Sequence, residues 1–175
     1  MTSRTPHHIE DKTKTNQSQV IDITERSTFF QISRTILIHA NHTIDIFTCK
    51  LEPDIVNHKT VIKALKALPR HSSKARLRIL IQESRDAVIE CATFVEMARK
   101  YSSFIECRRL GEIKEIKPTS WMTVDRETYI SRQHSQLFQA TACHQDKLTV
   151  RTLTERFDEH WEKSVPDPEL RRLLI

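Results

Sequence analysis

Hydrophobic residues recur with helical spacing in some segments of the chain and with strand spacing in others. Within residues 59–68, Val61, Leu65 and Leu68 repeat at intervals of three and four, which is typical of one buried helix face. The run at 76–82 is apolar and β-branched over the length of a strand buried on both faces. This spacing predicts helices over residues 24–40, 59–68, 86–102 and 148–164. Strands are predicted over residues 43–48, 76–82, 104–108, 121–125, 128–131 and 139–143.

Single residues are expected to set several of these helix boundaries. Asp22 or Thr24 is placed to cap the first helix, and Asp86 is placed to cap the third, since short polar side chains accept hydrogen bonds from free helical amides. Pro69 is expected to end the second helix, because proline has no backbone N–H to donate.

The order of the elements predicts the fold class. Helices and strands alternate as far as residue 108, which implies βαβ crossovers and parallel strands. After Gly111, two strands are joined by a tight turn at residues 125–127. We expect a single α/β domain over residues 22–175, with a mixed, mostly parallel central sheet flanked by helices. The polar residues 1–21 are expected to form a disordered tail.

Composition excludes several classes of function. Gly111 is the only glycine, so the chain cannot contain the glycine-rich loops that cradle phosphates or the glycine-flanked elbow that presents a hydrolase serine. No run approaches the roughly 20 apolar residues of a membrane span, and no signal-peptide core is present, so we expect a cytoplasmic protein. The four cysteines are far apart without metal-site spacing, and we expect free thiols, no metal and no cofactor.

Positive charge is concentrated in one segment. Residues 58–82 carry seven lysines and arginines and no acid, within a chain whose net charge is +5. Four of these cations share one face of the second predicted helix: Lys59, Lys63, Lys66 and Arg70. Such a row fits an anionic ligand or the phosphates of nucleic acid. A solvated helix face also explains the row and is the favoured interpretation, because no aromatic residues are interleaved to stack on bases.

The C-terminal part of the chain combines a strand ending at Asp125, a second strand containing Tyr129, the segment Ala140–His144 and a helix ending in Arg156–Trp161. This combination resembles the end of a phospholipase D-like domain. In that superfamily a His-x-Lys-x4-Asp motif lies on a strand and turn, and a Gly-Ser-x-Asn element follows it. A helix with Phe-Asp and Trp closes the fold.

The chain departs from the motif at the positions that carry the chemistry. With Asp125 as the motif aspartate, the histidine position falls on Pro118 and the lysine position on Ser120. The second element falls on Ala140–Thr141 and His144. The resemblance implies a histidine nucleophile and a phosphate-binding lysine. Proline cannot attack phosphorus and serine carries no charge, so a non-catalytic pseudoenzyme is expected.

More narrowly, residues 24–175 resemble a bacterial phospholipase D-like domain that lacks the motif and is often fused to acetyltransferases of the GNAT type. The matching stretches are Ile44–Thr48 followed by Leu51-x-Pro53, Ala75–Gln82, Ala98–Ser103 and Phe157–Leu173, the last being the most specific. The resemblance implies an acetyltransferase or another protein as a partner, and a homodimer by analogy with the superfamily.

Three functional hypotheses remain. The first is a non-catalytic binding or accessory module for nucleic acid or another anionic ligand. The second is a divergent phosphodiesterase or nuclease that recruits acids and a histidine near strand ends: Asp45, Glu83, Asp125 and His144. The third is an accessory subunit of an acetyltransferase, bound through the apolar C-terminal residues Leu170–Ile175.

Overall fold

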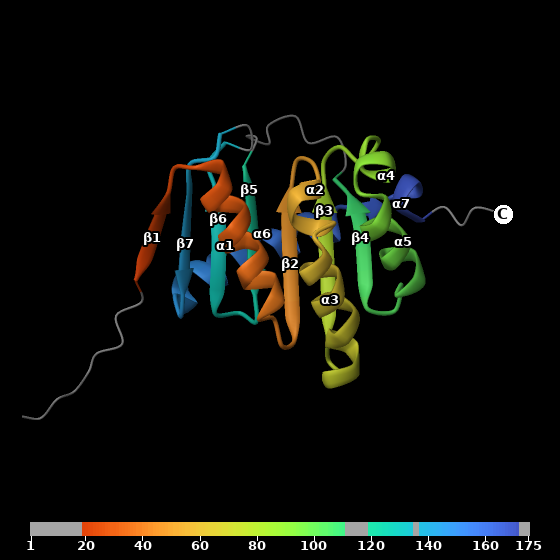
Figure 1. The fold of residues 1–175 in the computed structure, drawn as a ribbon, viewed down its shortest axis with the longest axis horizontal. Helices are drawn as coiled ribbons and strands as arrows, with labels where there is room; N and C mark the ends of the chain where they lie inside the picture. The colour runs from red at the N-terminus through yellow and green to blue at the C-terminus, as the bar shows by residue number, and fades with distance from the viewer. Residues whose placement is uncertain (1–18, 111–118, 135–136, 172–175) are drawn as a thin grey trace, which may run out of the picture.

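The computed structural model describes residues 19–110, 119–134 and 137–171 and contains one open eight-stranded sheet flanked by helices (Figure 1). The strand order is β1-β7-β6-β5-β2-β3-β4-β8. The strands are β1 (Val20–Ile23), β2 (Thr43–Thr48), β3 (Arg76–Ile81), β4 (Ile105–Arg109), β5 (Ser120–Val124), β6 (Thr128–Arg132), β7 (Ala140–His144) and β8 (Val165–Pro166). The helices are α1 (Arg26–Ile38), α2 (Pro53–Val56), α3 (Lys59–His71), α4 (Ala87–Glu90), α5 (Ala92–Lys100), α6 (Lys147–Glu162) and α7 (Pro168–Arg171).

The sheet is mostly antiparallel, so the prediction of a mostly parallel sheet is wrong. Among the described strands, β3 runs parallel to β2 and to β4, whereas the pairs β1–β7, β7–β6, β6–β5, β5–β2 and β4–β8 are antiparallel. Parallel neighbours need helical crossovers, which only the first half of the chain supplies. A tight turn joins β5 to β6, and such a turn can only place two strands antiparallel.

Each face of the sheet has its own hydrophobic core. Figure 1 shows α1, α2 and α3 on one face and α6 behind the other. Alternation along β2 divides its side chains between the two cores: Ile44 and Ile46 pack on the α1–α3 side, and Phe47 packs on the α6 side. The predicted stripe of α6 is confirmed, because its four members are buried there: Val150, Leu153, Phe157 and Trp161.

The first element among the described residues is a strand that the sequence analysis did not predict. Val20–Ile23 forms β1 at the edge of the sheet, where Asp22 lies opposite Thr141 of β7. Helix α1 then begins at Arg26, with Glu25 at the cap position, so neither Asp22 nor Thr24 caps it. Ile23 explains the difference, since its side chain is fully buried and ties this short segment to the core.

Pro69 lies inside α3 and does not end it. The helix continues to His71, and the backbone N–H of Ser72 still donates to the carbonyl of Leu68 at 3.1 Å. In the last turn, proline removes one hydrogen bond of the helix, and the buried residues of α3 hold the turn in place.

The predicted third helix is two helices, α4 and α5, separated at Cys91. The side-chain nitrogen of Asn57 donates to the carbonyl of Glu90 at 2.9 Å, and its oxygen accepts from the N–H of Phe94 at 2.9 Å. In a continuous helix the N–H of Phe94 would donate to the carbonyl of Glu90. The side-chain amide of Asn57 bonds to both groups instead and so interrupts the helix. Asp86 precedes α4, but its side chain makes no capping hydrogen bond.

The C-terminal segment docks on its own domain as far as the structure describes it. β8 pairs with β4, and Leu170 of α7 is buried in the main core. Arg99 of α5 fastens the segment by donating to the backbone carbonyls of Glu169 and Leu170 at 2.9 and 3.3 Å. Residues 172–175, which include most of the apolar C-terminus discussed above, lie outside the described residues. No helix of the described part is long and apolar enough to cross a membrane.

Candidate functional site

The position expected for a phosphate-binding lysine is internal and uncharged. Ser120 is the first residue of β5, is buried, and its Oγ accepts a hydrogen bond from Nε of Arg132 at 3.0 Å. The position expected for the histidine, Pro118, lies outside the described residues. Ser120 therefore has a structural partner inside the protein and offers no charge to a phosphate.

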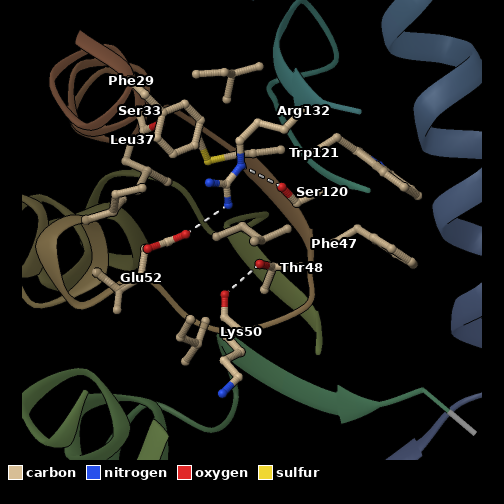
Figure 2. Close-up of a pocket in the computed structure, with 16 residues that line it drawn as sticks. Phe29, Ser33, Leu37, Phe47, Thr48, Lys50, Glu52, Ser120, Trp121 and Arg132 are labelled. Carbon is tan, nitrogen blue, oxygen red and sulfur yellow. Dashed lines mark hydrogen bonds and ion pairs between the residues drawn. The ribbon is translucent and has the colours of Figure 1, made fainter. Parts of the chain in front are cut away.

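Arg132 is a buried cation that the sequence analysis did not single out. It ends β6 with only 3% of its surface exposed, and its Nη2 donates to Oε1 of Glu52 at 2.9 Å (Figure 2). Its guanidinium also lies 4.4 Å from the ring centre of Phe29 in α1. In the sequence, Arg132 is only an arginine at the end of a predicted strand. Its burial could not be predicted, because its partners come from distant segments of the chain.

Asp45 is held in a buried ion-pair network on the α6 face. Arg78 lies directly opposite it on β3, and its Nε and Nη2 donate to the two carboxylate oxygens of Asp45 at 2.7 and 2.8 Å. Nη1 of the same arginine donates to Asp158 of α6 at 2.7 Å. The guanidinium also covers the rings of Phe157 and Trp161. Both oxygens of Asp45 are thus occupied, which favours a structural role.

Asp125 and Arg126 form the turn between β5 and β6. Their φ angles are 53° and 58°, and the N–H of Glu127 donates to the carbonyl of Val124 at 3.1 Å. Two successive residues with positive φ define the tight hairpin turn that matches the twist of antiparallel strands. Aspartate tolerates this conformation better than most residues other than glycine.

The carboxylate of Asp125 binds the start of β2. Its Oδ1 accepts from the backbone N–H groups of His42 and Thr43 at 2.7 and 2.9 Å, and its Oδ2 accepts from that of Asn41 at 2.8 Å. Three amides fix this carboxylate in place, so its lone pairs are already engaged. That arrangement favours a structural role over a general base.

His144 and Asp125 line the same hollow, at the edge of the sheet that Figure 1 draws at the bottom. The hollow is also lined by His39, Asn41 and Glu127. His144 is exposed at the end of β7, and its Nδ1 lies 2.8 Å from Oγ1 of Thr128 on β6. An imidazole at a solvent-facing hollow can exchange protons.

Glu83 is separated from that hollow by the length of the sheet. It follows β3 at the upper edge, where it pairs with Lys50 at 3.4 Å, and Asp86 pairs with the same lysine at 3.2 Å. These hydrogen bonds, from Asp86 first and then Glu83, raise the pKa of Lys50. β5 runs antiparallel to β2, and β3 runs parallel to β2, so the ends of β3 and β5 lie at opposite edges. The structure therefore does not bring the four candidate residues together.

The basic row on α3 is fully displayed to solvent. Its four members are exposed: Lys59, Lys63, Lys66 and Arg70. None of them forms a salt bridge with an acid among the described residues. The opposite face of α3, with Val61, Leu65 and Leu68, is buried against the domain. The row therefore projects outward as one continuous positive surface, which we call the α3 basic row.

The cysteines and acids form no metal centre in the described part. No group of three histidine, cysteine or acidic side chains there is placed to hold a metal ion. All four cysteines are free thiols. Burial, followed by the charges of Glu90 and Glu52, raises the pKa of Cys91 to about 12, so this thiol stays protonated at neutral pH.

Comparisons with known proteins identify a family of unknown function and solved structures with a similar fold. A family model described as a domain of unknown function, DUF7931, matches residues 25–173. No curated protein matches the chain by sequence.

Solved structures share the fold at low identity. Nuc from Salmonella typhimurium, a phospholipase D family member, is 13% identical with a TM-score of 0.64, over 86% of this chain and 99% of its own. NucT from Helicobacter pylori is 12% identical with a TM-score of 0.62, over 86% and 100% of the two chains. TrmBL2, an archaeal chromatin protein with a novel mode of DNA binding, is 16% identical with a TM-score of 0.58, over 90% of this chain but only 57% of its own. The fold is thus similar to that of the phospholipase D family.

Proposed function

The chain belongs to the DUF7931 family, a domain of unknown function, and we propose a role from its geometry. The protein is a binding module with a phospholipase D-like fold. It lacks phosphodiesterase activity and binds nucleic acid along α3. The observation that carries the proposal is the α3 basic row. Four exposed cations without acidic partners among the described residues are an electrostatic footprint suited to a polyanion.

The dimensions of the row fit a phosphate backbone. Eleven helical steps separate Lys59 from Arg70, which corresponds to about 16 Å of helix axis. Duplex DNA carries one negative charge per roughly 1.7 Å of its axis, so several phosphates lie within reach of the row. TrmBL2, which has a similar fold, is a DNA-binding chromatin protein, and this supports nucleic acid as the polyanion.

The absence of hydrolysis is supported by the positions that would carry it. The lysine position is the buried Ser120, and the carboxylate of Asp125 is bound by three backbone amides. Glu83 lies at the opposite edge of the sheet from Asp125 and His144. A bound nucleic acid would therefore be held and left intact.

Reversing two charges of the α3 basic row tests the binding. In Lys63→Glu/Lys66→Glu, we expect affinity for a labelled oligonucleotide duplex to fall about 10- to 100-fold at low salt. We expect the slope of log K against log salt to become shallower by about 2, since two phosphate contacts are lost. Fluorescence anisotropy between 50 and 200 mM salt measures both quantities.

A control with the same change in net charge separates a local site from general attraction. Lys147 and Lys163 are exposed at the two ends of α6, on the other side of the sheet. Lys147→Glu/Lys163→Glu should keep most of the affinity. If it loses as much as the α3 variant, or if the wild-type protein binds no duplex and no single strand, the proposal is wrong.

A divergent phosphodiesterase is the alternative, favoured by one observation: Asp125 and His144 line the same hollow. We expect the wild-type protein to release no nitrophenolate from bis(p-nitrophenyl) phosphate above the buffer rate. Release that is abolished in His144→Ala, but kept when the exposed His134 is changed to alanine, would establish the enzyme instead.

A further inference from the structure

An apolar cavity lies between α1, α2 and the sheet, close to the upper sheet edge (Figure 2). Its volume is about 60 Å³, and Lys50 is among the residues that line it. Most of its wall is hydrocarbon, including Phe29, Leu37, Ile46, Ile55, Met122 and Ile130.

Three residues that line the cavity have a buried polar atom without a hydrogen-bond partner among the described residues. One is Nε1 of Trp121, whose ring stacks on Phe47 in the core on the α6 side of the sheet. The other two are Nη1 of Arg132 and Oγ of Ser33, and both residues are almost completely buried, at 3% and 1% exposure. Figure 2 shows them entering the pocket from different elements, Arg132 from β6 and Ser33 from α1. A buried donor without an acceptor is costly, so these two groups favour a ligand that accepts hydrogen bonds.

The charge of the pocket favours a monoanion. Glu52 uses Oε1 to accept from Nη2 of Arg132, and Ser120 accepts from its Nε, which leaves the Nη1 edge directed elsewhere. The charged residues that line the pocket are Lys50, Glu52 and Arg132, so the lining carries one net positive charge. The remaining donor, Nη1, belongs to a charged group, and a charged donor makes a stronger hydrogen bond to a carboxylate than to a neutral acceptor.

We propose that this cavity binds a small carboxylic acid with a short aliphatic chain. The carboxylate accepts from Nη1 of Arg132 and from the hydroxyl of Ser33, and the chain lies against Phe29, Leu37 and Met122. Neighbouring side chains cover both polar atoms in the structure, so binding requires a local movement of the cavity wall. A cavity of this volume holds a few water-sized groups, which corresponds to about four to six non-hydrogen atoms. This site is separate from the α3 basic row and does not depend on the proposed binding of nucleic acid.

Methionine methyl groups report on the cavity directly. The chain has three methionines. Met122 lines the cavity, whereas Met97 is buried elsewhere, in α5, and serves as an internal reference. In protein labelled with ¹³C at the methionine methyls, titration with sodium butyrate should shift the Met122 resonance saturably. For so small a ligand we expect Kd on the order of 1 mM. Butylamine hydrochloride at equal ionic strength should leave Met122 unchanged.

Substitution of Ser33 separates a ligand contact from a structural one. Ser33→Ala removes a hydroxyl that bonds to no described residue, so folding should be unharmed while butyrate binding weakens about 5- to 10-fold. Ser27→Ala, at an exposed position of the same helix, should bind like wild type. The proposal is overturned if Met122 does not respond to 50 mM butyrate, if butylamine gives the same shift, or if Ser33→Ala binds as tightly as wild type.

Discussion

Replacing Arg78 by methionine is expected to lower the free energy of unfolding by about 3–5 kcal/mol. The side chains of Arg78 and Asp45 are only 8% and 9% exposed and form a bidentate salt bridge. Removing the arginine leaves the carboxylate of Asp45 buried without its partner. It also removes the guanidinium that covers Phe157 and Trp161. Chemical denaturation followed by tryptophan fluorescence measures the loss.

Two further variants identify the buried charge as the cause. Asp45→Leu/Arg78→Met removes both charges and should recover most of the lost stability, because well-packed apolar residues often replace a buried ion pair without cost. Arg151→Met breaks the salt bridge between Arg151 and Glu155, whose side chains are 77% and 61% exposed, and should leave the stability nearly unchanged. A double variant as unstable as Arg78→Met alone would contradict this explanation.

Asp125→Ala should destabilise the protein by about 2–4 kcal/mol. The substitution removes the acceptor for three backbone N–H groups, those of Asn41, His42 and Thr43. Alanine keeps the β-carbon at a φ of 53° but lacks the short polar side chain that lets aspartate tolerate this conformation. Thermal or urea unfolding followed by circular dichroism measures the effect.

Neighbouring substitutions distinguish the lost acceptor from the strained backbone. Asp125→Gly removes the strain but not the loss of the acceptor, whereas Asp125→Asn keeps one oxygen and tolerates the turn. Asp125→Asn should therefore be the mildest of the three. Arg126→Gly changes the next turn residue, whose φ is 58°, without touching the three amides, and should be neutral or slightly stabilising. If Asp125→Gly proves as stable as wild type, the carboxylate is not what holds the start of β2.

The periodicity of the sequence located most elements but not their boundaries or partners. The segments predicted as strands at 43–48, 121–125 and 128–131 correspond to β2, β5 and β6, and the hydrophobic stripe of α6 is confirmed. The break between α4 and α5 could not be predicted, because Asn57, a residue more than 30 positions earlier, supplies the amide that causes it. Periodicity also could not predict which neighbouring strands run parallel and which run antiparallel, because this depends on how the strands are connected.

Some features of the candidate site could likewise be predicted from the sequence, and others could not. The α3 basic row follows from spacing alone, because residues four and seven positions apart share a helix face. The sequence could not assign Arg78, the last of the seven cations in that region, which is turned away from solvent and toward Asp45. Nor could it join Arg132 of β6 to Glu52 near α2, since their contact spans 80 positions.

Residue type and short-range spacing were enough to predict most helices and strands, the positive face of α3 and the absence of glycine-rich phosphate loops. Only the folded chain shows which charges are buried, which carboxylates are bound by backbone amides, and where a cavity lies beside Arg132. These depend on strand register and on contacts between distant segments. Such contacts form only when the helices pack on both faces of the sheet.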